Sequence, residues 1–216
     1  SGVLPPATAT RYATLGAHVT LDRRDVRYTR EFGTRYVPSG DDLTDRPLNP
    51  DHGTLLSLDY LRFRELSDVD ASFSQLRLEA QQYVSFFNGY HTFALRHRST
   101  FTDPDVGEVV PFYWLPYAGG NFTVRGYDEF RFQGGRHGVL YNLEYRYKVW
   151  HHADVVLFGD AGKVFDSIEE WGVTNLRYSY GAEIRFTTPR TTLFRVGVAF
   201  DENHSSRLVF EFSNVF

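Results

Sequence analysis

Apolar and polar residues alternate along most of the chain, as expected of strands with one apolar and one polar face. In Gly138–Trp150, apolar and aromatic residues fill the odd positions, and Asn142, Glu144 and Arg146 lie between them. Further strands are predicted at Arg11–Asp22, Gly53–Leu66, Ala71–Phe86, His91–Phe101, Ala153–Phe165, Asn175–Thr187, Thr191–Phe200 and Arg207–Phe216. Val26–Val37 shows a weaker alternation, so we expect nine or ten strands and no long helix.

The alternation alone does not say which face meets solvent. A soluble β-sandwich or a lipocalin-like barrel buries the apolar face, whereas a membrane barrel turns that face to lipid. The polar face carries acidic and basic residues together, as a small barrel with an ion-paired interior would. Aromatic residues also gather near strand ends, as at Tyr147 and Trp150. The pattern favours the membrane barrel and leaves the soluble alternative open.

Composition narrows the function classes. The chain has 216 residues, enough for one domain, and 17% of them are aromatic. A net charge of −4 gives no basic field for nucleic acid, and the absence of Cys excludes thiol chemistry. The absence of Met suggests a processed or trimmed chain. The longest nearly apolar stretch, Val109–Gly120, contains two prolines and is too short for a membrane helix.

A Gly- and Pro-rich loop at residues 102–137 carries the most specific motifs. It contains Pro111-Phe112-Tyr113, then Tyr117–Gly120, then the Val-Arg-Gly-Tyr sequence of Val124–Tyr127. These pieces resemble the sixth extracellular loop of the outer membrane protein 85 superfamily, which includes the barrel-inserting BamA and TamA and the protein exporter FhaC. Leu143-Glu144-Tyr145 and Phe158–Phe165 resemble the strands that follow that loop. The final Phe216, with Phe210 and Phe212 on the same face, resembles the C-terminal signal read by the barrel assembly machinery.

The resemblance implies an all-β, transmembrane, antiparallel up-and-down β-barrel in the bacterial outer membrane, with the loop folded inward. We expect a flexible segment at residues 1–10 and a single barrel domain at residues 11–216. Full members have a larger barrel and periplasmic POTRA domains, so the chain would be a short member or a C-terminal barrel fragment without them. An even strand count places both termini in the periplasm, so we expect eight to ten strands and favour ten.

The polar faces place two acids where they could meet. Glu144 and Asp160 both lie on the face opposite the aromatic residues, on neighbouring predicted strands. The resemblance supplies a cation, Arg125, as a loop lock between them. In this interpretation Gly126 permits the turn beside Arg125, Tyr127 completes the signature and Gly162 leaves space on the wall. The alternative is that Glu144 pairs only with neighbouring bases such as Arg146 or Arg177.

No other motif points to catalysis or to a cofactor. The eight His residues, including His97 and the pair His151-His152, lack metal-ligand spacing, and Gly-x-Ser-x-Gly is absent. The sequence Asp201–Ser205 is interpreted as a polar turn. We therefore expect a non-enzymatic barrel, without metal or cofactor, that inserts or translocates polypeptides. Its expected partners are the lipid bilayer, the barrel assembly machinery, a client polypeptide and a second copy. The alternatives are a membrane anchor for a further domain and an outer-membrane lipase or protease.

Overall fold

The structure is a computed structural model that describes residues 11–24, 50–66, 70–87, 89–150, 152–187 and 192–212. Nine antiparallel strands form one sheet in the order β1-β2-β3-β4-β7-β8-β9-β10-β11. They are β1 (Tyr12–Asp22), β2 (Gly53–Glu65), β3 (Phe73–Phe86), β4 (His91–Pro104), β7 (His137–Trp150), β8 (Ala153–Phe165), β9 (Arg177–Thr187), β10 (Thr192–Asp201) and β11 (Ser206–Glu211). The short strands β5 (Tyr117–Ala118) and β6 (Phe132–Gln133) pair separately within the long loop, and two short 3-10 helices are η3 (Phe112–Trp114) and η4 (Ile168–Glu170).

The all-β antiparallel architecture is confirmed, and each sheet strand falls on a predicted segment. The described residues contain nine sheet strands, and the expected even count of the whole chain stays a prediction. β1 pairs directly with β2, from Tyr12 opposite Glu65 to Asp22 opposite Leu55. The predicted strand Val26–Val37 lies outside the described residues, as do the predicted flexible residues 1–10. Neighbouring strands alternate in direction, so β1 and β11 run the same way, and no described pairing joins them.

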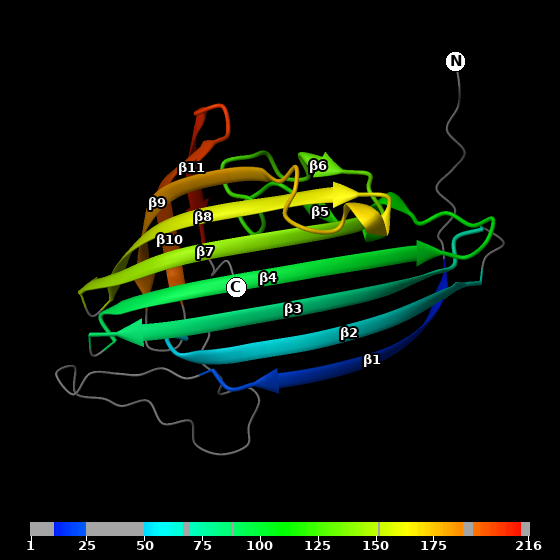
Figure 1. The fold of residues 1–216 in the computed structure, drawn as a ribbon, viewed down its shortest axis with the longest axis horizontal. Coiled ribbons are helices and arrows are strands. Elements are labelled where there is room, and N and C mark those ends of the chain that lie inside the picture. Colours follow the sequence, from blue (N-terminus) through cyan, green and yellow to red (C-terminus); the bar gives the residue numbers. More distant parts are fainter. Residues whose placement is uncertain are drawn as a thin grey trace.

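The sheet curves into a wall, and the long loop with β5 and β6 lies beside β7 and β8 (Figure 1). β9, β10 and β11 continue the curvature and turn away from the plane of β2, β3 and β4 (Figure 1). No described helix is long and apolar enough to cross a membrane.

The two faces of the wall have inverted polarity relative to a soluble protein. Charged and polar side chains of the concave face are buried: Gln75, Gln81, Arg96, Asn142, Glu144, Arg146, Asp154, Asp160, Glu183, Arg185 and Arg195. Large apolar side chains of the convex face are exposed: Leu78, Val84, Phe93, Leu95, Leu143, Val149, Leu157, Ile184 and Val196. A soluble sandwich would bury the second set and expose the first. The distribution is that of a barrel wall whose convex face meets lipid.

One part of the convex face is covered by the chain itself. Ser99, Val139 and Lys163 lie at one level of β4, β7 and β8. The indole Nε1 of Trp171 donates to Ser99 Oγ at 3.0 Å, and Lys163 Nζ donates to the carbonyl of Thr174 at 2.8 Å. The connection between β8 and β9 therefore folds over the wall. Val139, at an odd position of the aromatic face, is buried there instead of facing lipid.

Candidate functional site

The loop between β4 and β7 is held against the concave wall by its backbone. Three consecutive loop carbonyls accept hydrogen bonds from wall side chains. Arg195 Nη2 of β10 donates to the Asn121 carbonyl at 2.7 Å, and Arg96 Nη1 of β4 donates to that of Phe122 at 3.4 Å. Asn142 Nδ2 of β7 donates to the Thr123 carbonyl at 2.7 Å. Three strands thus fix the segment that leads into Arg125.

Arg125 is fully buried and reaches the two acids predicted for it. Its Nε donates to Asp160 Oδ2 at 2.7 Å, and its Nη2 donates to Asp160 Oδ1 at 2.8 Å. Its Nη1 donates to Glu144 Oε1 at 3.0 Å, and its backbone N–H donates to Asp160 Oδ2 at 3.0 Å. The guanidinium therefore binds Asp160 of β8 in a two-bond fork and reaches Glu144 of β7 with its remaining nitrogen.

The acids also fix the charge state of the loop cation. Burial lowers the pKa of Arg125, but the Coulombic attraction of Asp160, its hydrogen bonds, and the charge of Glu144 more than offset this. The pKa of Arg125 therefore lies above its ordinary value, and the side chain stays charged although it is out of water.

Glycines allow the loop and the wall to approach closely. Gly126 has φ +89, a left-handed conformation that favours Gly, and a Cβ built there would lie 3.1 Å from the Ala199 Cβ. At Gly162 of β8, a Cβ would lie 3.0 Å from the Val139 carbonyl oxygen and 3.2 Å from Val124 Cγ2 of the loop. Both predicted glycines thus occur where the loop lies against the wall.

Tyr127 lies apart from the acids and ties the loop to β9. Its hydroxyl donates to the Tyr178 carbonyl at 3.1 Å and accepts from the Glu202 N–H at 3.4 Å. Its ring meets Phe132 edge to face, with the ring centroids 4.9 Å apart. The Val-Arg-Gly-Tyr sequence therefore contacts the wall at two places, through Arg125 at β7 and β8 and through Tyr127 at β9.

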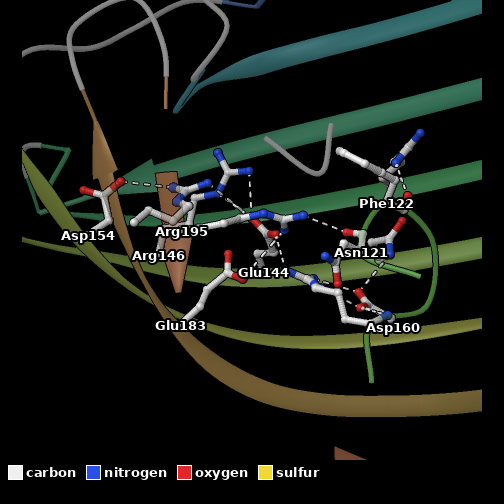
Figure 2. Close-up of polar contacts among 12 residues, drawn as sticks. Asn121, Phe122, Glu144, Arg146, Asp154, Asp160, Glu183 and Arg195 are labelled. Atoms are coloured by element: carbon white, nitrogen blue, oxygen red, sulfur yellow. Dashed lines mark hydrogen bonds and ion pairs between the residues drawn. The ribbon is translucent and has the colours of Figure 1, made fainter. Parts of the chain in front are cut away.

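The charged cluster is larger than the sequence predicted. Arg146 Nε donates to Glu144 Oε2 at 2.8 Å, so the alternative Glu144–Arg146 pair exists beside the Arg125 contact. Arg177 instead pairs with Glu202. The cluster also contains Glu183, Arg185, Arg195 and Asp154, which brings it to four acids and four arginines (Figure 2). Asp154 lies at one end of the cluster, where it pairs with Arg185. Glu183 lies between Arg125 and Arg195.

Glu183 is the main residue that the sequence analysis missed. Its Oε2 lies 3.5 Å from Arg125 Nη1 and 3.7 Å from Arg195 Nη1. Glu183 and Arg185 share the polar face of their strand, and this alternation is the signal that could have found them. The alternation does not give the register between neighbouring strands. In the structure, that register sets Arg185 opposite both Asp154 of β8 and Arg195 of β10.

A second anchor of the loop is aromatic. Trp114 of η3 packs on Phe63 of β2, with the ring centroids 4.4 Å apart, and more loosely on Phe73 of β3. Phe63 and Phe73 stack on each other at 4.5 Å. Gln75 Nε2 donates to the Trp114 carbonyl at 3.0 Å. The loop is therefore fastened to the N-terminal strands as well as to the charged cluster.

Trp114→Ala is expected to loosen the N-terminal half of the loop and lower the free energy of unfolding by about 3 kcal/mol, because a large packed ring is removed. Limited proteolysis and the thermal midpoint measure this. Phe112→Ala is the matched control, since Phe112 lies in the same turn but is 77% exposed. Equal effects of the two substitutions would contradict an anchoring role for Trp114.

The remaining predicted residues lie away from this cluster. Phe210 and Phe212 are exposed near the end of the chain, and their rings meet edge to face. Phe216 lies outside the described residues, so the C-terminal assembly signal stays a prediction. Asp201 Oδ1 accepts the N–H groups of Asn203 and Ser205, each at 2.9 Å, as a polar turn does. Among the described residues, no group of three or more His, Asp or Glu is placed to hold a metal ion.

Comparison with known proteins gives the family. The model of the Omp85 superfamily domain matches residues 17–216. The chain belongs to the Omp85 superfamily. This Omp85 chain is therefore an outer-membrane β-barrel protein of the family that assembles and translocates polypeptides in the bacterial outer membrane.

A solved structure supports the fold of this Omp85 chain. BamA from Haemophilus ducreyi lacking POTRA domains 1-3 matches with a TM-score of 0.63 and 16% sequence identity. The match covers 94% of this chain and 54% of that structure, so the chain spans about half the length of its structural relative. No curated protein matches by sequence.

Proposed function

We propose that this Omp85 chain is a non-enzymatic barrel wall that inserts or translocates a client polypeptide by pairing a client strand with a free sheet edge. Family membership supports the general class of function. The observation that carries the specific proposal is the pair of described edges: β1 pairs only with β2, and β11 pairs only with β10. Unpaired backbone groups are costly in lipid, so such an edge binds another strand.

Strand direction favours a partner from outside the nine strands. β1 and β11 run the same way, so direct closure between them would be a parallel pairing. A second copy rotated about the barrel axis offers its β11 to β1 in that same parallel direction. A client strand can enter antiparallel to either edge. We therefore propose the client strand as the partner and keep a homodimer as the alternative.

Cross-linking can separate these partners, because the chain has no Cys of its own. The protein carrying Leu15→Cys on β1 is reconstituted in liposomes and given an unfolded client barrel with a Cys in its terminal strand. We expect a client cross-link and faster protease-resistant insertion than in empty liposomes. Leu143→Cys is the matched control, since Leu143 is also exposed but lies on β7, which pairs on both sides.

Each result decides between the partners. A cross-link between two copies carrying Leu15→Cys and Phe210→Cys, without a client adduct, would favour the homodimer. Equal client labelling at Leu15 and Leu143, or insertion no faster than in empty liposomes, would contradict the edge-pairing function. A membrane anchor would show neither insertion nor client labelling.

One observation favours a hydrolase as the second candidate. His18 of β1 contacts the Asp59 carboxylate through Nδ1, and its Nε2 lies 2.5 Å from Thr20 Oγ1. This order of acid, imidazole and hydroxyl is the arrangement that activates a hydroxyl nucleophile. Hydrolysis of a nitrophenyl acyl ester by the purified protein, abolished in His18→Ala, would support it. No hydrolysis above that of His18→Ala would rule it out for such esters.

A further inference from the structure

A cavity of about 760 Å³ lies between the long loop and the concave wall, beside the charged cluster. Its wall side is formed by β3, β4, β7 and Lys163 of β8, and its loop side by residues from Phe112 to Gln133. Neither Arg125 nor its acids line it. The cavity is thus a separate feature from the loop lock, and its volume is in the range of sites for small ligands.

The wall side of the cavity is cationic. Arg77, Arg96 and Arg98 line it, and no carboxylate does. Glu79, outside the lining, pairs with Arg96 at 3.0 Å and with Arg98 at 2.7 Å. Among the described residues, Arg77 forms no ion pair, and its one hydrogen bond reaches Gln75 Oε1 at 3.5 Å. Arg96 and Arg98 therefore both pair with Glu79, and the guanidinium of Arg77 is left to bind an anionic ligand.

The loop side of the cavity is aromatic. Tyr113, Trp114, Phe122 and Phe130 line it, and three of them are exposed by 38–57%. These side chains lie on the interior side of the wall, where the bilayer does not cover them. An apolar aromatic surface therefore faces the same space as the arginines.

We propose that this cavity binds an amphiphile that carries a phosphate or carboxylate head group on an acyl chain. The head group pairs with Arg77 and Arg98, because guanidinium groups bind both anions in a fork. The acyl chain lies on Tyr113, Trp114 and Phe122, which removes apolar surface from water. A cationic ligand is disfavoured by the arginines, and a neutral chain leaves Arg77 without a counterion.

The test uses the full chain in phosphatidylcholine nanodiscs and a dodecyl phosphate probe that carries a diazirine on its chain. After illumination, adducts are located by mass spectrometry of peptides. We expect them on the segment from Phe112 to Tyr117 and around Phe122. Dodecyl phosphate and dodecanoate should compete with the probe, and the stronger competitor identifies the head group. Dodecyl maltoside, with the same chain and no charge, should not compete.

Arg77→Gln is expected to lower labelling at least tenfold at a subsaturating probe concentration, with an unchanged thermal midpoint, because Arg77 holds no ion pair of the wall. Arg64→Gln on β2 is the matched control and should label as the native chain does, since Arg64 does not line the cavity. Labelling unaffected by Arg77→Gln, or removed equally by dodecyl maltoside, would overturn the proposal. Competition by inorganic phosphate as strong as by dodecyl phosphate would also overturn it, because the acyl chain would then contribute nothing.

Discussion

Arg125→Ala is expected to release the long loop from the barrel wall and to lower the free energy of unfolding by about 3–5 kcal/mol. The guanidinium is fully buried and makes three side-chain hydrogen bonds to Asp160 and Glu144. Removing it leaves the two carboxylates on adjacent strands without their shared cation. Glu183 loses a nearby positive charge as well, because its Oε2 lies 3.5 Å from Arg125 Nη1.

Limited proteolysis of the loop and the thermal midpoint measure this effect, and two further substitutions grade it. Asp160→Asn should be milder, because Glu144 still accepts from Arg125. Arg125→Lys should rescue only part of the loss, since an ammonium cannot replace the two-bond fork. Arg136→Ala is the control, because Arg136 is a half-exposed loop cation paired with Asp166. If Arg125→Ala and Arg136→Ala gave the same proteolysis pattern, the loop would be held by other contacts.

The period-2 pattern predicted which residues share a face, and this is why the acids of the site could be found from the sequence. Strand alternation is fixed by backbone geometry, so Glu144 and Asp160 face the interior whatever the neighbouring strands are. Their exact relation depends on register, which the pattern does not contain. The structure sets Asn142 opposite Asp160 and Glu144 opposite Phe158. Arg125 therefore bridges the two acids diagonally, beside Asn142.

Contacts made by curvature and by loop folding could not be predicted in this way. Glu183 reaches Arg125 because β9 continues the curve of the wall, and curvature has no local sequence signal. Trp114 lies in a loop without periodicity, so nothing in the sequence pointed to its packing on Phe63. The pairing of the first strands could not be predicted either. The weak alternation of Val26–Val37 suggests a strand between β1 and β2, whereas β1 and β2 pair directly with each other.

Gly181→Ala is expected to disturb both the wall and the loop, although Gly181 touches neither acid. A Cβ built at Gly181 would lie 2.1 Å from the Val198 carbonyl oxygen and 2.6 Å from Phe158 Cζ. Both distances are too short for any real side chain, so the strand and the ring must shift. Arg125 Cζ lies 3.6 Å from the centroid of that Phe158 ring, as in a cation–π contact. A displaced ring therefore transmits the strain to Arg125.

The expected loss in the free energy of unfolding is about 1–3 kcal/mol from overpacking, with about 2 kcal/mol more if the buried cation–π contact is lost. The measurements are again the thermal midpoint and proteolysis of the loop. Gly159→Ala is the matched control, because a Cβ at Gly159, on neighbouring β8, would meet no atom within 4 Å. A lower midpoint with an intact loop would place the strain in β9 and β10 alone. Increased loop cleavage in Gly181→Ala but not in Gly159→Ala would show that contact with the Phe158 ring helps to hold Arg125 in place, since the substitution leaves Asp160 and Glu144 unchanged.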